Sequence, residues 1–540
     1  MIALERESTV MKRYLKIERI FIVILMLQIA NFIFWGYQKE GYHIDEIYSY
    51  GLSNSYYRPY VDSNNEHWNV WHNEDYFKQY VEVQADHRFA YDSVYYNQTC
   101  DVHPPVYYFI LHTVCSFFPN QFSKWFGISI NIVFMVAALT ILYYISRLLW
   151  KENKWLPIII CLFYGFSPGA VNNVIYIRMY VILEFITLLY LYMHLQLMEK
   201  YSTKKYIILF GITLLGTLTH YYFLVFAFFV SAVYFITLIW NRYWRRIVYY
   251  LIAVPGAIAL AVCIYPSALA HIFSGRGRSA GNILDTEYKE KLIEFYLYIS
   301  RQLFGGYLKY ILCFYILITI VIFIVHAISL QRKNESIVLQ IEEKYEINCK
   351  LLIQFACIFI TAIMYYLIVV KVTTIRADRY IFNIYPLIVL LFFELLWLIY
   401  KNLNRMKIPY LIINMLILTA LTYRGYNQES LEYWYKGYHE MQTELSKYQQ
   451  DKVIYVSPYN FTIYRDWQFL SQMGDYYIVA PDDVGRMDLG EENNNLEHII
   501  VYVYKDLDAQ DILNMIEKKL NLTGSDFVLE TYQSNVFYCY

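Results

Sequence analysis

Long apolar runs, separated by short polar segments, dominate the first 424 residues of the chain. A helix that crosses a bilayer needs about 20 mostly apolar residues. The pattern therefore predicts a polytopic α-helical membrane protein with about 11 spans. The predicted spans lie near 18–37, 125–149, 154–168, 174–197, 205–220, 221–240, 246–266, 307–330, 350–370, 380–400 and 407–424.

The pattern changes after residue 424, where short β-type alternation replaces the long apolar runs. We therefore expect a transmembrane domain at 1–424 and a small α/β domain at 425–540. The predicted strands are Val453–Tyr459, Tyr476–Val479, Glu497–Tyr504 and Phe527–Tyr540, and the predicted helix is Asp508–Leu520.

Basic residues predict how the spans are oriented, because cytoplasmic loops of membrane proteins are enriched in Lys and Arg. If the basic N-terminus is cytoplasmic, every short basic loop falls on the same side of the membrane. Segment 38–124 then becomes the first outer loop, and 425–540 is extracytoplasmic. We expect a multi-pass protein of the plasma (cytoplasmic) membrane. The basic residues are Lys12, Arg13, Lys16, Arg19, Arg147, Lys151, Lys154, Lys200, Lys204, Lys205, Arg242, Arg245, Arg246, Arg332, Lys333, Lys344, Lys350, Lys401, Arg405 and Lys407.

Composition supports the membrane assignment and excludes one class of partner. Apolar residues make up 58% and charged residues 17% of the chain, against roughly 25% charged residues in ordinary globular proteins. The 60 Tyr and 11 Trp suit the membrane–water interface and contact with lipids. The formal net charge of -1 and the lack of any nucleic-acid-reading motif argue against a nucleic-acid partner.

Ionisable residues at the predicted outer ends of spans indicate chemistry, because a charge near hydrocarbon is costly. His43, Asp45 and Glu46 follow the first span directly. Asp45 could take a proton from an acceptor hydroxyl as a general base. It could equally cap a helix N-terminus, and the residues alone favour neither role.

Cationic groups occur in several other outer segments. His103 precedes two prolines, which fix the backbone, although a solvated imidazole in a turn would look the same. Arg178 offers a planar fork that matches phosphate; it could also contact lipid headgroups or pair with Glu184. His220 lies between two predicted spans.

Arg376, Asp378 and Arg379 precede a late span. Asp378 could neutralise one arginine and leave the other for a phosphate, while headgroup anchoring is the ordinary alternative. Together the outer charges supply a base for a hydroxyl acceptor and cations for an anionic leaving group.

Five motifs follow one another along the chain: HIDEIYSYGLSNS, DVHPPVYYFILH, YIRMYVILEFITLLYLY, LTHYYFLVFAF and RYIFNIYPLIVLL. In these motifs and their order the sequence resembles the bacterial branch of the GT-C glycosyltransferases, the family 39 and Rgt-like enzymes related to protein O-mannosyltransferases and lipid A aminoarabinose transferase. The resemblance covers roughly 40–400.

The resemblance implies an inverting glycosyltransferase that moves a monosaccharide, hexosyl or pentosyl, from a polyprenyl-phosphate donor to a hydroxyl acceptor on the outer membrane face. The acceptor would be a cell-envelope glycan, a lipid or a protein. Asp45 matches the catalytic acid of the first loop, and Glu46 its partner. The residues implied to bind the donor phosphate are His103, Arg178, His220, Arg376 and Arg379. The other implied pocket residues are His43, Tyr107, Tyr180 and Tyr221.

Two departures from the family pattern bear on acceptor and metal. The insertion between Tyr56 and Asp101 is long, and the loop 167–173 lacks an acidic residue that some relatives carry. We expect no required cofactor and leave a divalent metal open, because Asp45 and Glu46 alone offer few ligands.

Two other classes of protein compete with the transferase. A transporter or flippase for an anionic lipid-linked substrate would also use outer Arg and His, and it predicts broken helices and internal repeats. A non-catalytic receptor would leave the clustered outer charges without a purpose.

Overall fold

The computed structural model describes residues 2–61, 68–273, 285–332, 349–403, 406–428, 430–493 and 496–540. Of the basic residues used for orientation, Lys333, Lys344 and Arg405 lie outside this range. The chain forms two compact units. The first unit comprises 1–36, 129–175 and 179–432, and the second comprises 37–128, 176–178 and 433–540.

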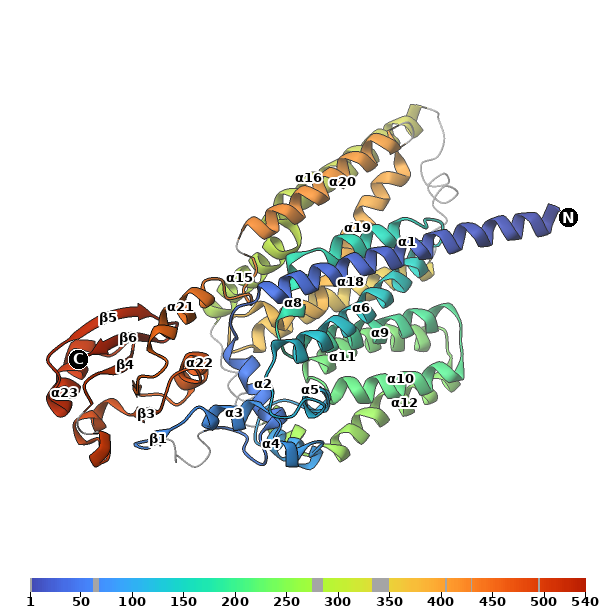
Figure 1. Ribbon diagram of the computed structural model, residues 1–540. Helices are drawn as coiled ribbons and strands as arrows, with labels where there is room; N and C mark the ends of the chain where they lie inside the picture. Colours follow the sequence, from blue (N-terminus) through green and yellow to red (C-terminus); the bar gives the residue numbers. More distant parts are fainter. Residues whose placement is uncertain are drawn as a thin grey trace. The chain divides into compact units, whose positions relative to one another are not determined.

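The first unit is built from long apolar helices (Figure 1). Helix α10 packs against α12, and α11 against α18. The helices are α1 (Ile2–Gln38), α6 (Lys124–Leu149), α7 (Leu156–Gly165), α8 (Pro168–Ile175), α9 (Tyr180–Glu199), α10 (Thr203–Thr217), α11 (Tyr222–Trp240), α12 (Trp244–Ile264), α13 (Ser267–Phe273), α15 (Asp285–Phe304), α16 (Leu308–Arg332), α18 (Cys349–Val372), η3 (Asp378–Ile384), α19 (Tyr385–Asn402) and α20 (Lys407–Asn427).

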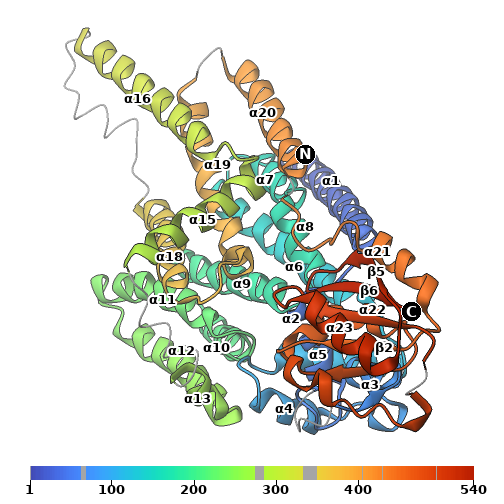
Figure 2. The same cartoon turned by 90° about the vertical axis from the view of Figure 1, so that its left-hand side faces the viewer.

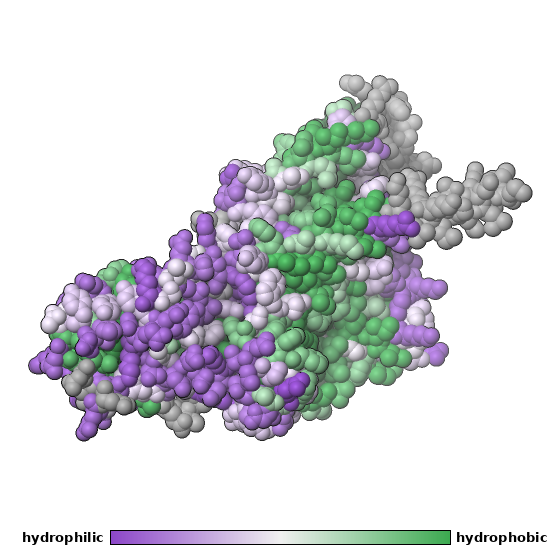
Figure 3. Space-filling model, viewed as in Figure 1, coloured by the Kyte–Doolittle hydropathy of each residue, from purple (hydrophilic) through white to green (hydrophobic). Residues whose placement is uncertain are grey.

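The described residues contain eight helices long and apolar enough to cross a membrane, or up to ten when each bent helix pair is one span. Helices α7 and α8 are bent by 56°, and α15 and α16 by 74°. The expected polytopic helical membrane protein is therefore confirmed, and the number of about 11 spans stays a prediction. On the face shown in Figure 3, hydrophobic residues form a broad area over the helices of the first unit.

One predicted span boundary is wrong. The run 174–197 was expected to be one helix, but α8 ends at Ile175 and α9 begins at Tyr180. The main-chain N–H of Ile177 donates to the Glu46 side chain at 2.7 Å, outside any helical hydrogen-bond pattern. Arg178 consequently lies in a short non-helical segment rather than within an apolar helix.

The second unit contains a six-stranded sheet in the order β1-β3-β2-β4-β6-β5 (Figure 2). Strand β2 is parallel to both β3 and β4, whereas β6 is antiparallel to β4 and β5. Strand β1 comes from the segment 38–124 and pairs antiparallel with β3. The strands are β1 (Trp71–His72), β2 (Val453–Val456), β3 (Tyr476–Val479), β4 (Ile499–Tyr504), β5 (Ser525–Glu530) and β6 (Ser534–Cys539).

The expected small α/β domain is confirmed. Helix α23 (Ala509–Leu520) packs its apolar face on the sheet, and the residues of β2 and β3 are all buried. The sequence did not predict α21 (Tyr438–Leu445) or α22 (Phe461–Leu470). The domain boundary expected at 424/425 stays a prediction; the chain passes into the second unit at Tyr433.

The segment 38–124 belongs, as part of 37–128, to the same unit as the sheet. Its helices are short, and α2 packs against α3, α4 and α5. Helix α5 directly follows the two prolines, and Pro105 is its N-cap. The helices are α2 (Ile44–Asn54), α3 (Asp75–Val81), η1 (Ala85–His87), α4 (Tyr91–Thr99) and α5 (Val106–Ser116).

Candidate active site

The start of α2 places the predicted acidic pair in two different environments. His43 is the N-cap, and its Nδ1 accepts the main-chain N–H of Asp45 at 3.1 Å. Glu46 completes a capping box by accepting the N–H of His43 at 2.6 Å. The alternative in which Asp45 caps the helix is therefore wrong, because His43 and Glu46 perform that role.

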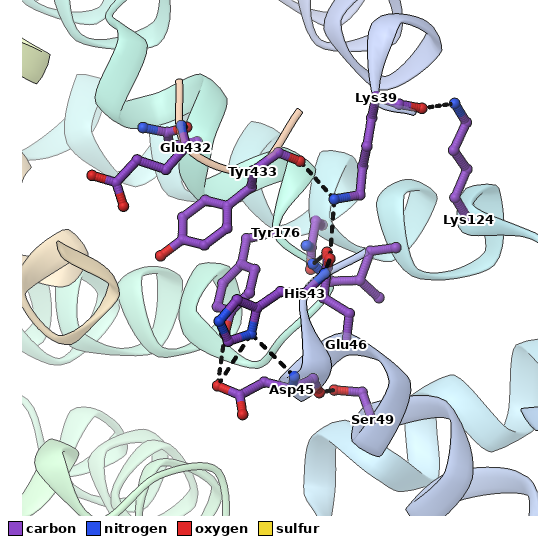
Figure 4. Close-up of polar contacts among 12 residues, drawn as sticks. Lys39, His43, Asp45, Glu46, Ser49, Lys124, Tyr176, Glu432 and Tyr433 are labelled. Atoms are coloured by element: carbon purple, nitrogen blue, oxygen red, sulfur yellow. Dashed lines mark hydrogen bonds and ion pairs between the residues drawn. The ribbon is translucent and has the colours of Figure 1, made fainter. Parts of the chain in front are cut away.

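Glu46 is fully buried and holds the site together (Figure 4). Its carboxylate pairs with Lys39 at 3.0 Å and accepts the Ile177 N–H at 2.7 Å. Burial raises the pKa of Glu46, and the attraction of Lys39 and the main-chain donors oppose that rise. The structure thus gives Glu46 a positioning role, since both carboxylate oxygens are engaged by protein donors.

Lys39 lies at the start of segment 38–124 and contacts the segment that enters the α/β domain. Its ammonium donates to the main-chain oxygen of Tyr433 at 2.6 Å (Figure 4). Lys124 donates in turn to the main-chain oxygen of Lys39. Burial lowers the pKa of Lys39, and the charge of Glu46 opposes that change.

The Asp45 carboxylate lies at the surface of this framework. It accepts the hydroxyl of Tyr176 at 2.9 Å, and its side chain is 25% exposed. The His43 Nδ1 lies 3.7 Å away. Since that nitrogen accepts the N–H of Asp45, its proton lies on Nε2. Asp45 is therefore oriented and reachable, which are the two conditions for a general base.

Arg178 is buried, with 4% of its surface exposed, directly beside α2. Its Nη1 lies 3.1 Å from the main-chain oxygen of Asp45, 3.2 Å from Ser49 Oγ and 3.1 Å from the Tyr108 hydroxyl. The short segment 176–178 thus positions Tyr176, Ile177 and Arg178 on the same few residues of α2. Tyr107 is buried beside Tyr108, their ring centroids being 5.7 Å apart.

Asp101 and His103 form a pair at the start of the Pro-Pro turn. His103 Nδ1–H donates to Asp101 at 2.9 Å. Burial lowers the pKa of His103, although Asp101 opposes this. Burial alone would raise the pKa of Asp101, but His103 and Arg178 outweigh it and lower that pKa. Because Nδ1–H is held by Asp101, Nε2 is the nitrogen of His103 that can gain or lose a proton.

Three other predicted residues meet in the first unit around Tyr380. The ring of Tyr180 lies 5.5 Å from His220 and 6.1 Å from Tyr380, measured between centroids. The guanidinium of Arg379 lies 5.1 Å from the centre of the Tyr380 ring. That this cluster and the Asp45 cluster serve one ligand stays a prediction.

The remaining predicted residues have other partners. Arg376 is exposed and pairs with Glu290 at 2.9 Å and Glu294 at 3.3 Å. Tyr221 hydrogen-bonds His271 at 3.0 Å. Arg376 is therefore the weakest of the predicted phosphate ligands, since two carboxylates already face it.

The expected internal partners of two arginines are also engaged elsewhere. Glu184, considered as a partner for Arg178, accepts a hydrogen bond from Asn173 at 2.7 Å. Asp378, considered as a partner for Arg376 or Arg379, accepts one from Gln302 at 2.6 Å.

Sequence reasoning missed several members of the site. Asp101 stands two residues before His103 and Tyr176 two before Arg178, so proximity in the sequence could have indicated both. Lys39 and Tyr433 come together only through the fold, and no sequence signal links them.

A metal centre is not formed by these side chains. Within the described ranges, no group of three or more His, Cys, Asp or Glu is placed to hold a metal ion. We therefore assign no step to a metal.

No protein-family model matches the chain. No curated protein is similar to it in sequence. Among solved structures, it is similar to ArnT from Cupriavidus metallidurans bound to undecaprenyl phosphate, with 10% identity over 98% of each chain and a TM-score of 0.48. For the apo state of ArnT the identity and coverage are the same and the TM-score is 0.46.

Proposed function

We propose that the protein is an inverting glycosyltransferase of the membrane, which transfers a monosaccharide from a polyprenyl-phosphate donor to a hydroxyl acceptor. One observation carries the proposal: the half-buried carboxylate of Asp45 is on the first turn of α2, and the buried guanidinium of Arg178 contacts the main-chain oxygen of that same residue. A base beside a fixed cation is the pair that displacement of a phosphate from a sugar requires.

The reaction proceeds by direct displacement. The acceptor oxygen attacks the anomeric carbon while the bond from that carbon to the phosphate oxygen breaks. Asp45 takes the acceptor proton, the polyprenyl phosphate leaves with the electron pair, and the anomeric configuration inverts. Tyr176 orients the Asp45 carboxylate through its 2.9 Å hydrogen bond.

The charges on the leaving group are met by Arg178 and His103. Apart from the buried pair of Lys39 and Glu46, Arg178 supplies a permanent positive charge here, and Asp45 and Asp101 supply two carboxylates. We expect the arriving phosphate to raise the pKa of His103, so that the imidazole becomes protonated and offsets the second carboxylate. Asp101 holds the imidazole so that Nε2 takes up that proton.

A transporter of an anionic lipid-linked substrate remains the second candidate, because the two bent helix pairs resemble the broken helices that such proteins use. Consumption of a radiolabelled polyprenyl-phosphate sugar by purified protein in detergent separates the two. The transferase releases polyprenyl phosphate when an acceptor-containing envelope extract is added, whereas a transporter leaves the donor intact.

We place the reaction on the outer face, with the N-terminus cytoplasmic, because the short basic loops then share one side. Cysteine labelling from outside intact cells at Gln450, an exposed residue of the second unit, tests this orientation. Labelling only after the membrane is opened would place the second unit on the cytoplasmic side and contradict this orientation.

A further inference from the structure

A pocket of about 270 Å³ lies within the second unit, on the side of the α/β domain that carries α22. It is lined by α3, by the segments that precede α2 and α6, and by α22 with the turn that follows it. Its volume is slightly below the roughly 300–1,000 Å³ of drug-sized ligand sites. The lining residues are Tyr42, Lys78, Val81, Glu82, Phe122, Trp467, Gln468, Ser471 and Gln472.

One wall of the pocket is aromatic. The rings of Phe122 and Trp467 are 4.9 Å apart at their centroids and nearly perpendicular. Tyr42 lies 5.1 Å from Phe122 and 6.3 Å from Trp467. The electron-rich ring faces attract the weakly positive C–H groups of a sugar ring, and their flat surfaces exclude water.

The other walls supply hydrogen-bonding groups of mixed type. The amides of Gln468 and Gln472 each offer a donor and an acceptor, and Ser471 adds a hydroxyl. The pocket offers no net positive charge, because Glu82 is an anion and Lys78 is a cation that already pairs with Glu74 at 2.8 Å. Such a set suits a neutral, polyhydroxylated ligand and gives a phosphate no net attraction.

The pocket adjoins the framework of the Asp45 site. The Tyr42 ring, which lines the pocket, lies 5.7 Å from the Lys39 ammonium that pairs with Glu46. Tyr42 also precedes Asp45 by only three residues. Helix α22, which carries Trp467, packs against α2, where the ring of Tyr464 lies 4.6 Å from that of Tyr48.

We propose that this pocket binds one neutral sugar ring of the acceptor, and so that the acceptor is a glycan of more than one residue. This assignment to the acceptor rests on the proposed transferase function. The pocket holds one sugar ring of the acceptor glycan while a hydroxyl of another sugar residue of the same glycan reaches Asp45.

The test uses full-length protein in detergent and a panel of neutral trisaccharides: chitotriose, maltotriose, cellotriose and mannotriose. Saturation-transfer NMR measures binding to wild type, to the double variant Gln468→Ala/Gln472→Ala and to the matched control Gln450→Ala. Gln450 is exposed and lies outside the pocket. Melting temperatures check that all three proteins fold alike.

We expect at least one trisaccharide to bind to wild type and to the control. The double variant should bind it about tenfold more weakly. Equal binding by all three proteins, or no binding of any trisaccharide to wild type, overturns the proposal.

The donor-consumption assay separates a failure of the pocket proposal from a failure of the proposed transferase function. Pocket-dependent sugar binding without donor consumption refutes the transferase and leaves a sugar-binding pocket. Donor consumption with no pocket-dependent binding refutes the pocket and leaves the transferase.

Discussion

Arg178 Nη1 lies 3.1 Å from the main-chain oxygen of Asp45, so the guanidinium is hydrogen-bonded to the backbone of the proposed base. The same nitrogen also contacts Ser49 and Tyr108. A shift of α2 would therefore move the base and the cation together, which keeps their spacing constant during catalysis.

Arg178→Lys tests whether this geometry is required. Lysine keeps the charge but loses the planar fork and the reach to three oxygens. We expect kcat to fall about 10²-fold, as for the loss of one charge-stabilising donor, with the melting temperature within a few degrees of wild type. The matched control is Arg465→Lys on the exposed face of α22. Unchanged kcat in Arg178→Lys would remove the arginine from the chemistry.

His103 makes donor binding depend on pH. Burial lowers its pKa in the free protein, and a bound phosphate raises it, so binding takes up a proton. Donor affinity should therefore increase as pH falls from 8 to 6, by up to about tenfold per pH unit. The donor is a phosphodiester and does not titrate in this range, so the protein causes the dependence.

Equilibrium binding of a polyprenyl-phosphate sugar at several pH values measures this effect. His103→Asn should flatten the profile, whereas His439→Asn, at an exposed histidine, should keep it. A flat wild-type profile would contradict the proton uptake.

The buried pair of Lys39 and Glu46 should matter for stability. Lys39→Met leaves the Glu46 carboxylate buried without its cation, which costs about 3–5 kcal/mol. We expect a clear fall in melting temperature, partly recovered in Lys39→Met/Glu46→Gln because that variant buries no charge. Lys518→Met, at an exposed lysine of α23, is the control. If Lys39→Met has the melting temperature of wild type, the pair of Lys39 and Glu46 does not stabilise the fold.

Asp466 in α22 predicts a pH effect on the α/β domain. Burial raises its pKa to about 6, against the hydrogen bonds from Ser534, Thr531 and Tyr455. A raised carboxyl pKa means that the folded state binds a proton more tightly than the unfolded one. Stability should therefore increase as pH falls from 7.5 toward 4, and it is lowest above pH 6.

Asp466→Asn imitates the protonated form and removes this dependence. Hydrogen exchange of β2 and β6 should show more protection in the variant than in wild type at pH 7.5, with little difference at pH 5. Comparing the two proteins at each pH cancels the intrinsic exchange rates. Greater protection of wild type at pH 7.5 would show that the carboxylate is well stabilised where it lies.

Much of the fold follows from local patterns. Apolar runs of about 20 residues are forced into helices, because backbone groups in a bilayer need internal partners. The short apolar run within Glu497–Tyr504 likewise predicted β4, since such a run is typical of a strand buried in a sheet. The break at 176–179 could not be predicted, because it depends on the carboxylate of Glu46 accepting the N–H of Ile177.

The site was predictable to the extent that its residues are rare charges beside apolar runs. Asp45, His103 and Arg178 were found in this way, and they lie together within the second unit. The buried pair of Glu46 with Lys39 was not predicted, because no sequence signal marks Lys39 as its partner. Strand β1 was missed because two residues give no pattern, and its pairing with β3 bridges about 400 residues of sequence.

The most direct measurement is the single-turnover rate of sugar transfer from a polyprenyl-phosphate donor by purified Asp45→Asn and by wild type. The control is Asp86→Asn, which changes an exposed aspartate in the same segment 38–124. We predict that Asp45→Asn folds and binds the donor but transfers the sugar about 10²- to 10⁴-fold more slowly, as expected for the loss of a general base. Asp86→Asn should transfer it at the wild-type rate. Transfer by Asp45→Asn at the wild-type rate would contradict this prediction.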